Sequence, residues 1–220
     1  MKKQALVIGL GEFGMSVARA LASRDVEVLA IDRNTHRVRL AASFTAEALT
    51  FDATDETSLA RAAPAKRDLS VCTIGQESKE ASIICTALLR QMGAPRVIAR
   101  ANDELHARIL SLVGAHEVVN PEREFGEQFA TRLVYENVVG ELPLGHDLVI
   151  TQLQVPAAFV GRCLKELDLP RKHGITVVAM FEEAHRPSVA LPRPDKPLRE
   201  GELMLVVSKP GAVARMLERL

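Results

Sequence analysis

The sequence is poor in aromatic residues and in cysteine. It has no tryptophan, one tyrosine (Tyr135) and three cysteines among 220 residues. Cys72, Cys85 and Cys163 are odd in number, lie far apart and never form a C-x-x-C spacing, so the sequence indicates neither a disulfide framework nor a zinc site. We expect buried free thiols, because cysteine without such a role packs as a small apolar residue.

An excess of one charge and long apolar runs are also missing. Lys plus Arg and Asp plus Glu both number 28, which gives a formal net charge of zero. A neutral chain without a basic run has little attraction for nucleic acid or an anionic membrane surface, so we predict no nucleic-acid partner. No apolar run approaches the roughly 18 to 20 residues of a membrane helix, and the start leaves no room for a secretory signal. These absences predict a cytoplasmic protein.

The first part of the chain alternates between short β-branched apolar runs and helical patterns, at spacings of about 20 to 25 residues. This rhythm predicts parallel strands joined by crossover helices. Six such strands fit a doubly wound α/β sheet of the Rossmann-like type with the first strand in the centre. A further helix, from Pro121 to about Tyr135, is expected to lead away from the sheet. The expected strands are Ala5–Gly9, Glu27–Ile31, Glu47–Phe51, Leu69–Ile74, Arg96–Ala101 and Glu117–Val119.

The pattern changes after Asn137. The segment Val138–Gly145 carries turn formers without helical periodicity, so we expect a linker or an extended arm there. The remainder is typical of a small α+β module, which gives the expected domains 1–137 and 138–220. We expect strands at Asp147–Val155, Ile175–Phe181 and Leu203–Ser208, helices at Cys163–Leu167 and Pro210–Leu220, and in the proline-rich stretch Arg186–Pro197 at most a loop with an edge strand.

The strongest motif is a G-x-G-x-x-G sequence formed by Gly9, Gly11 and Gly14, placed between an apolar strand and a helix. In such a motif the glycines allow a tight turn, a close approach of phosphates, and tight packing of helix on strand. Asp32 ends the second strand, where an acid accepts hydrogen bonds from ribose hydroxyls. It disfavours a ligand with a 2′-phosphate, although Arg33 beside it leaves that question open. The sequence therefore predicts a nucleotide site.

Two more segments follow strands and should meet the same edge of the sheet. Asp52, Ala53 and Thr54 follow the third strand, and Asp52 is placed to approach the adenine amine, while a helix cap is the structural alternative for this stretch. Ile74 and Gly75 end the fourth strand, and a glycine there permits a close backbone approach or simply makes a turn.

Groups for catalysis are not apparent. A nicotinamide dehydrogenase needs a proton-transfer group beside the ring, commonly a Tyr-x-x-x-Lys pair or a His with a carboxylate. Tyr135 does not begin such a pair, and there is no Walker A or G-x-S-x-G sequence. No two histidines have the H-x-x-x-H spacing: His36, His106, His116, His146, His173 and His185. We therefore predict no enzymatic activity.

The ordered set of motifs resembles the RCK (regulator of K⁺ conductance) family, and above all the cytoplasmic subunits of Ktr and Trk potassium-uptake systems. The resemblance covers nearly the whole chain, because Leu144 to Leu220 is similar to the RCK C-terminal subdomain. It rests on the order of Ile8-Gly9-Leu10-Gly11-x-Phe13-Gly14, Leu29-Ala30-Ile31-Asp32-x-Asn34, Asp52-Ala53-Thr54, Arg100-Ala101-Asn102, Gly114-Ala115 and Asn120-Pro121-Glu122-Arg123.

This resemblance implies a regulatory subunit at the inner face of the cell membrane. Its members form dimers through the later strands and helices, and dimers assemble into rings, commonly of eight subunits, under a membrane K⁺ translocation subunit. Adenine nucleotides bind at the glycine loop, and different nucleotides favour different ring shapes. The resemblance also implies that Arg100 approaches the phosphates. It implies that Glu122 helps to bind a monovalent or divalent cation at the dimer interface, with a helix-dipole role as the alternative.

Glu12 departs from the family pattern, because many Ktr subunits carry arginine within this loop. Beside Phe13, Glu12 places a negative charge near the expected terminal phosphate of ATP. The repulsion makes ADP, AMP or NAD(H) credible ligands. A compensating positive charge on Arg100 would restore binding of ATP. The C-terminal subdomain binds cyclic di-AMP in some relatives. No residue of this sequence decides whether this chain binds it. Two other functions remain as alternatives: a small NAD-dependent oxidoreductase and a stand-alone nucleotide or redox sensor.

Overall fold

The computed structural model describes residues 2–75, 78–145, 147–181 and 189–220. It divides into two compact units, Met1–Arg123 and Glu124–Leu220, and helix α6 (Pro121–Val134) spans the division. The two family-typical modules expected from the sequence are thus both present as folded units. The domain boundary expected after residue 137, which assigns α6 to the first module, stays a prediction.

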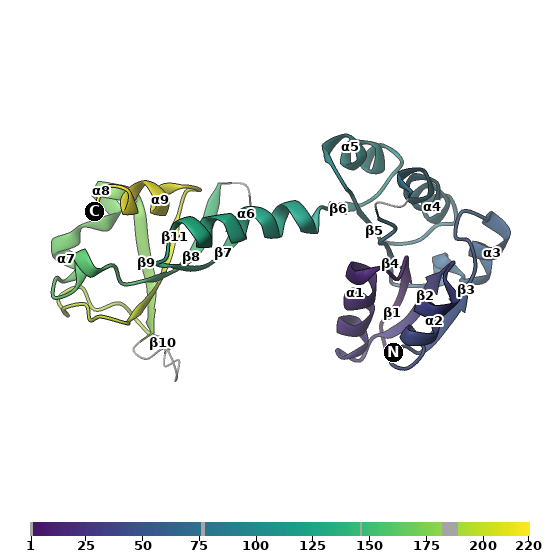
Figure 1. The fold of residues 1–220 in the computed structure, drawn as a ribbon, viewed down its shortest axis with the longest axis horizontal. Coiled ribbons are helices and arrows are strands. Elements are labelled where there is room, and N and C mark those ends of the chain that lie inside the picture. Colours follow the sequence, from purple (N-terminus) through teal and green to yellow (C-terminus); the bar gives the residue numbers. More distant parts are fainter. Residues whose placement is uncertain (1, 76–77, 146, 182–188) are drawn as a thin grey trace. The chain divides into compact units, whose positions relative to one another are not determined.

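The first unit contains the predicted six-stranded parallel sheet (Figure 1). Its strand order is β3-β2-β1-β4-β5-β6, so the first strand is central as predicted. All neighbouring strands pair in parallel, and the chain crosses over through helices. The strands are β1 (Gln4–Ile8), β2 (Glu27–Asp32), β3 (Glu47–Thr50), β4 (Leu69–Cys72), β5 (Val97–Arg100) and β6 (Glu117–Val119).

Apolar side chains project from both faces of this sheet, because helices cover both faces. Along β1, Leu6 and Ile8 belong to one buried cluster and Val7 to another, which is the two-residue alternation of a strand. Helices α1 and α2 pack on the Val7 face, and α3, α4 and α5 contribute to the opposite cluster. The helices are α1 (Glu12–Ala22), α2 (Thr35–Ala41), α3 (Glu56–Arg61), α4 (Lys79–Gln91) and α5 (Glu104–Leu112), with a 3-10 turn at Pro64–Lys66.

Polar side chains begin several of these helices at one edge of the sheet. Asn34 accepts hydrogen bonds from the backbone N–H groups of His36 and Arg37 at the start of α2. Asp55 accepts one from the N–H of Ser58 at the start of α3. Such caps satisfy backbone donors that have no partner within the helix. They fix the loops that follow β2 and β3.

The cysteine prediction holds for two of the three thiols. Cys72 in β4 and Cys85 in α4 are buried and free, and Cys163 is free but only half-buried. A hydrogen bond from Cys85 lowers the pKa of Cys72 to about 7, while the pKa of Cys85 is raised. Both buried thiols belong to the apolar cluster between the sheet and helices α3, α4 and α5. They are part of the packing of the first unit.

The second unit is an antiparallel sheet in the order β10-β9-β11-β8-β7. The segment expected as a linker or an extended arm is instead strand β7, which pairs with β8 from Val138 to Leu144 with a register shift between Val138 and Gly140. This expectation was wrong because β7 is a sheet edge, where Gly140 and Pro143 are tolerated without helical or alternating periodicity. The strands are β7 (Val138–Leu144), β8 (Leu148–Gln154), β9 (Ile175–Phe181), β10 (Val189–Ala190) and β11 (Leu203–Ser208).

Within the described residues, most of α6, three shorter helices and a short 3-10 turn complete the second unit. The expected helices near Cys163 and at the C-terminus are present, and a further short helix, α8, was not expected. The edge strand expected between Arg186 and Pro197 is β10, but residues 186–188 of that stretch lie outside the described residues. Leu153, Met204 and Met216 are among the fully buried side chains of this unit. The helices are α7 (Leu164–Leu167), α8 (Leu169–His173) and α9 (Ala212–Leu217), with the 3-10 turn at Ala157–Phe159.

Candidate functional site

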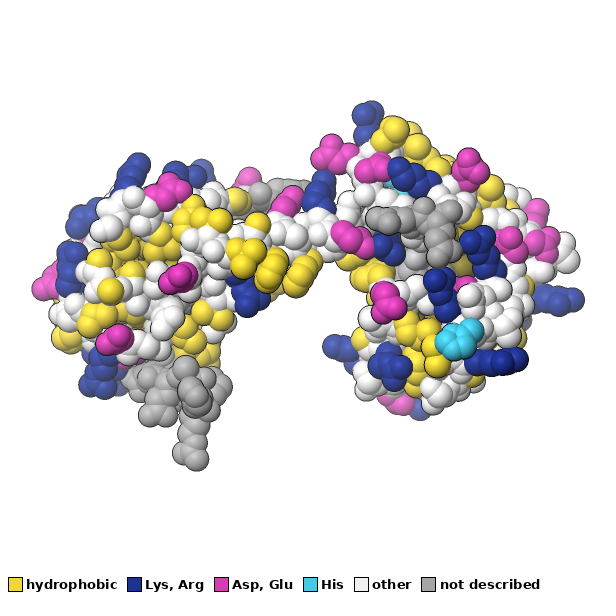
Figure 2. Space-filling view, viewed as in Figure 1, with side chains coloured by type: hydrophobic (Ala, Val, Ile, Leu, Met, Phe, Trp, Pro, Cys, Tyr) yellow, Lys and Arg dark blue, Asp and Glu magenta, His cyan; other side chains and the backbone are white. Residues whose placement is uncertain are grey.

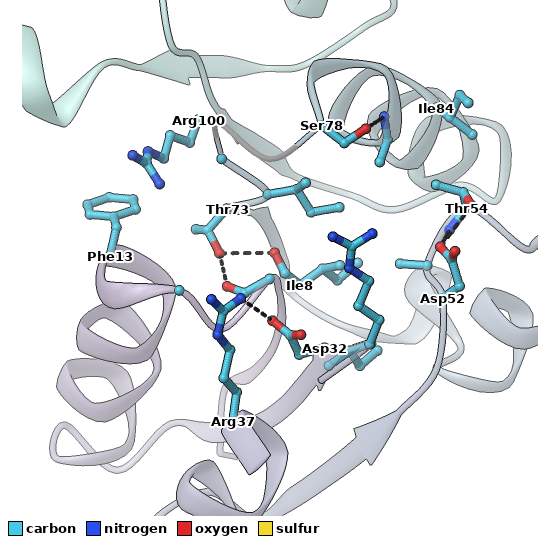
Figure 3. Close-up of a pocket in the computed structure, with 18 of the residues that line it drawn as sticks. Ile8, Phe13, Asp32, Arg37, Asp52, Thr54, Thr73, Ser78, Ile84 and Arg100 are labelled. Atoms are coloured by element: carbon cyan, nitrogen blue, oxygen red, sulfur yellow. Dashed lines mark hydrogen bonds and ion pairs between the residues drawn. The ribbon is translucent and has the colours of Figure 1, made fainter. Parts of the chain in front are cut away.

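A pocket of about 670 Å³ opens at the carboxyl edge of the parallel sheet (Figure 3). Clefts of this size and position are the usual ligand sites of doubly wound folds. The structure brings together all of the predicted site residues except Gly14, which does not line the pocket. The predicted residues that line it are Gly9, Gly11, Glu12, Phe13, Asp32, Arg33, Asp52, Ala53, Thr54, Ile74, Gly75, Arg100 and Glu122.

The glycine loop has the geometry that the motif predicts. Gly9 has a φ of +94°, and a Cβ atom there would lie 2.8 Å from the backbone nitrogen of Ile74. A Cβ atom on Gly14 would overlap the carbonyl oxygen of Gly9 and the hydroxyl of Thr73. Gly11 has open space around its missing Cβ and precedes the first turn of α1. The loop is therefore packed tightly on its protein side and open on the side where a ligand's anion can meet the helix N-terminus.

Asp32 is buried at the end of β2, and each of its two carboxylate oxygens accepts a hydrogen bond from a backbone N–H. Its Oδ2 accepts the N–H of Leu10 in the glycine loop at 2.6 Å, and its Oδ1 accepts the N–H of Asn34 at 2.7 Å. Arg37 Nη1 lies 3.9 Å from Oδ2. Asp32 thus helps to shape the loop. A carboxylate has about four acceptor positions, so the predicted contact with ribose hydroxyls is compatible with these bonds and stays a prediction.

Thr73 supports the same loop and was missed among the predicted site residues. Its hydroxyl lies 2.9 Å from the carbonyl oxygen of Ile8 and 2.5 Å from that of Gly9 (Figure 3). Since β4 is the neighbour of β1, a polar residue just past β4 reaches the turn that follows β1. The position of Thr73 after an apolar strand was the available signal. A hydroxyl there orients the two carbonyls and, through them, the turn at Gly9.

Asp52 and Thr54 lie at the other end of the pocket from Phe13 (Figure 3). Oδ1 of Asp52 accepts both the backbone N–H of Thr54 at 2.9 Å and its hydroxyl at 2.8 Å. The N–H bond is the main reason why the pKa of Asp52 is lowered. An ionised acceptor and the half-exposed Ile84 of α4 therefore share this end of the pocket. That pairing of a polar edge with an apolar surface suits a planar heterocycle.

Arg100 dominates the opposite end. Its guanidinium lies over the ring of Phe13, 5.6 Å from the centroid, and forms an ion pair with Glu122 in the first turn of α6. The Glu122 carboxylate therefore has a basic partner within the same unit. Among the described residues no group of three or more His, Cys, Asp or Glu side chains is arranged to hold a metal ion. The cation expected at Glu122 stays a prediction.

The pocket is rich in charge, with acids in the majority. Its described lining holds five acidic residues and only three arginines, Arg33, Arg37 and Arg100. Arg37 was not among the predicted site residues, although it lies in α2, five residues after Asp32. Ser78, which caps α4, and Ile84 within α4 were not predicted either. On the face of the molecule drawn in Figure 2, basic and acidic side chains are interspersed. An anionic ligand must therefore be held by specific groups at the pocket.

Fold and pocket together define a Rossmann-like domain followed by a small antiparallel module. The model of the TrkA-N domain matches residues 5–121, and that of the TrkA-C domain matches residues 148–220. The chain therefore belongs to the TrkA-N family and carries a TrkA-C domain, which confirms the predicted membership of the RCK group.

Relatives of known name align along the whole chain. Ktr system potassium uptake protein C of Bacillus subtilis is 30% identical over 220 residues, which cover 100% of this chain and 98% of the relative. Ktr system potassium uptake protein A of Vibrio alginolyticus is 32% identical over 218 residues, covering 99% and 98%.

Solved structures share the fold. The GsuK RCK domain superposes with a TM-score of 0.66 at 19% identity, over 98% of this chain and 47% of that chain. A GsuK channel bound to NAD gives a TM-score of 0.65 at 19% identity, over 97% and 38%. This chain thus spans about half or less of those structures' chains. No helix within the described residues is both long and apolar enough to cross a membrane.

Proposed function

We propose that this chain is a cytoplasmic regulatory subunit of a K⁺ transport system, in which an adenine nucleotide bound at the glycine loop controls a membrane translocation subunit. The pocket of about 670 Å³ at the glycine loop carries the proposal. Alignment over the full length of two Ktr subunits supports it. A ligand in such a subunit acts only through its different affinity for two states of the assembly.

The charge of the pocket favours a ligand with few phosphates. Glu12 is exposed in the first turn of α1 and lines the pocket, so it repels a terminal phosphate placed near the loop. Arg100, whose guanidinium lies over the ring of Phe13 in the same helix turn as Glu12, is already paired with Glu122. We therefore propose ADP or NAD(H) as the preferred ligand over ATP, with Asp32 on the ribose and Asp52 at the adenine amine.

Exposed apolar side chains support assembly into dimers. Phe125, Phe129 and Leu133 follow one another at i, i+4 and i+8 along α6 and are 64%, 44% and 68% exposed. Their yellow patch is visible in Figure 2, and the rings of the two phenylalanines stack with 5.7 Å between centroids. Leu105 and Leu112 of α5 are exposed as well. Such a surface is typical of a protein interface. We propose a homodimer through these helices, with dimers forming a ring, commonly of eight.

A binding role fits the pocket better than catalysis. Its described lining contains no histidine, cysteine, tyrosine or lysine that could move a proton beside a nicotinamide ring. The NAD-dependent oxidoreductase remains the alternative that turnover of NADH with a substrate panel would support. A stand-alone sensor is the other alternative, and absence of any membrane partner would favour it.

Calorimetry tests the ligand. We expect ADP or NADH to bind more tightly than ATP, and Glu12→Arg to raise the affinity for ATP by about tenfold, since a repulsive contact becomes attractive. Glu56→Arg, which places the same change in the first turn of α3 outside the pocket lining, is the matched control. Tight ATP binding by the native chain, much better than ADP, would contradict the argument from Glu12.

Gene deletion tests the transport role. In the organism that carries this gene, we expect deletion to lower rubidium uptake and growth at low external K⁺, and the wild-type gene to restore both. A variant whose glycine loop cannot bind nucleotide, Gly14→Val, is expected to restore neither uptake nor its response to nucleotide. Unchanged uptake in the deletion strain would favour the stand-alone sensor.

A further inference from the structure

A histidine ring holds the backbone just past the end of β5. Arg100 is the last residue of β5, and the next amide, the N–H of Ala101, still donates to the carbonyl oxygen of Val119 in β6 at 2.8 Å. The N–H of Asn102 donates instead to a side chain, at 3.3 Å from Nδ1 of His106. His106 lies in the first turn of α5 and is 1% exposed. The imidazole thus fixes the backbone two residues beyond the arginine of the pocket.

Buried polar atoms without a partner gather in the same segment. Among the described residues, five buried side-chain nitrogen and oxygen atoms lack a hydrogen-bond partner. Four of them lie here: Nε of Arg100, Oδ1 and Nδ2 of Asn102, and Nε2 of His106. Such atoms are costly and call for an explanation in a native structure. They give the segment no hydrogen bond, which leaves its backbone bonds, that of Asn102 included, to hold it in place.

His106 can accept this bond only while its ring is neutral. A neutral imidazole has one N–H, and since Nδ1 accepts the Asn102 amide, the proton belongs on Nε2. Protonation of Nδ1 would set two donors against each other and place a charge in a buried site. Burial is the main cause that lowers the pKa of His106, the carboxylate of Asp103 opposes it, and the ammonium of Lys79 in α4 adds to it. The ring is therefore neutral at about pH 7.

Arg100 is the group that this segment presents to the pocket. Its guanidinium lies over the ring of Phe13 and lines the pocket, whereas His106 does not. We infer that His106 is a positioning residue of the nucleotide pocket: its Nδ1 atom holds the backbone after β5 in the arrangement that presents Arg100 to a ligand phosphate. The inference rests on the proposed nucleotide binding and deepens it. Without the bond the segment populates other arrangements, and restoring the competent one lowers the apparent affinity.

The same strand has a second histidine bond at its other end. Nδ1 of His116 accepts the backbone N–H of Val97, the first residue of β5, at 2.8 Å. His116 is exposed and does not line the pocket. Because the pocket lies at the carboxyl edge of the sheet, Val97 lies at the opposite edge. His116 is therefore a matched control, with the same kind of bond on the same strand at the end away from Arg100.

The test is a calorimetric titration of the full chain with ADP at about pH 7.5, where the imidazole is neutral. His106→Leu removes the acceptor, and we expect it to bind ADP about tenfold more weakly. His106→Asn places an amide oxygen near the position of Nδ1 and should return the affinity to within about twofold of the wild type. His116→Leu should leave the affinity unchanged. Wild-type affinity in His106→Leu overturns the inference, and so does an equal loss in His106→Leu and His106→Asn.

A pH profile separates this role from a purely structural one. Between about pH 7.5 and about pH 5, the ADP affinity of the wild type should fall relative to that of His106→Asn, since only the histidine gains a proton and loses its bond. The ratio of the two affinities at each pH cancels the titration of ADP itself. His116→Leu should keep the profile of the wild type. A ratio that stays constant over this range overturns the inference.

Hydrogen exchange of the Asn102 amide gives a readout that needs no ligand. We expect this amide to exchange faster in His106→Leu than in the wild type, and at the wild-type rate in His116→Leu. Unchanged exchange in His106→Leu overturns the inference. If neither ADP, ATP, AMP nor NADH binds the wild type, the proposed nucleotide function fails and the inference with it. Nucleotide binding that ignores His106 defeats the positioning role alone.

Discussion

The two units of this chain differ in the direction of their strands and in the size of the pocket beside the sheet. In the first unit, parallel strands end at one common edge, and the loops and helix N-termini after them surround a pocket of about 670 Å³. In the second unit, antiparallel strands pair along most of their length, and the pocket found beside Met180 and Leu198 has a volume of only about 20 Å³. That is room for about one water molecule. The common edge at which the parallel strands end accounts for the larger of these two pockets.

The largest effect on stability is expected in the second unit. Leu153 is fully buried in β8, and Leu153→Ala should lower the free energy of unfolding by about 2 to 5 kcal/mol, because it leaves a cavity in a core with no ligand to fill it. Hydrogen exchange of β8 and β11 measures the loss. ADP affinity should not change. If Leu153→Ala lowers the free energy of ADP binding as much as it lowers the free energy of unfolding, ligand binding in the first unit depends on the core of the second unit.

Gly14→Ala is expected to have the next largest effect, and in the first unit. Its Cβ would overlap the Gly9 carbonyl and the Thr73 hydroxyl, so the loop must move. We expect ADP affinity to fall by about 100-fold, since a displacement of about 1 Å suffices for such a loss. Gly126→Ala in α6 is the matched control, because nothing lies within 4 Å of its added Cβ. A Gly14→Ala chain that binds ADP normally would show that the loop is not the site.

Asp32→Asn should have an intermediate effect on both stability and binding. The amide keeps one acceptor oxygen, so either the Leu10 or the Asn34 N–H loses its partner, at about 1 to 3 kcal/mol of unfolding free energy. Chemical denaturation and an ADP titration measure the two losses. Asp55→Asn serves as the comparison: asparagine caps helices as well as aspartate does, so that variant should be nearly neutral. Equal behaviour of the two variants would contradict a special role for Asp32.

Thr73→Val should have the smallest effect, about 1 kcal/mol, because it removes one hydrogen bond to the turn at Gly9 without changing the shape of the side chain. Thr86→Val removes a comparable bond, from Thr86 to the carbonyl of Ser82 at 2.8 Å within α4. Melting curves should show similar losses for the two variants, but only Thr73→Val should weaken ADP binding. A parallel loss of affinity in Thr86→Val would mean that stability alone sets the affinity.

Much of the first unit could be predicted because its signals are local. Buried parallel strands are continuous apolar runs. Gly9 lies in the turn after β1, Gly14 in the first turn of α1 and Asp32 at the end of β2, three positions where the nucleotide-binding motif calls for these residues. The pocket lining followed from the rule that strand ends share one edge. What the sequence could not give were contacts between distant positions: the two backbone bonds of Asp32, the clamp by Thr73 and the pairing of Arg100 with Glu122.

The second unit was harder to predict for a related reason. Strand β7 carries Gly140, Pro143 and no alternation, because an edge strand exposed to solvent needs none, so its pairing with β8 left no trace in the sequence. Helix α8 is only five residues long and includes a proline, and short elements of this kind are fixed by tertiary packing.

Hydrogen exchange of the full chain with and without saturating ADP tests whether the glycine-loop pocket binds the nucleotide. We expect protection of the backbone at residues 9–15, 32–37, 52–54 and 73–75, and no protection of β8 or β11. Protection confined to residues 148–220, or no change anywhere with ADP, ATP or NADH, would contradict it.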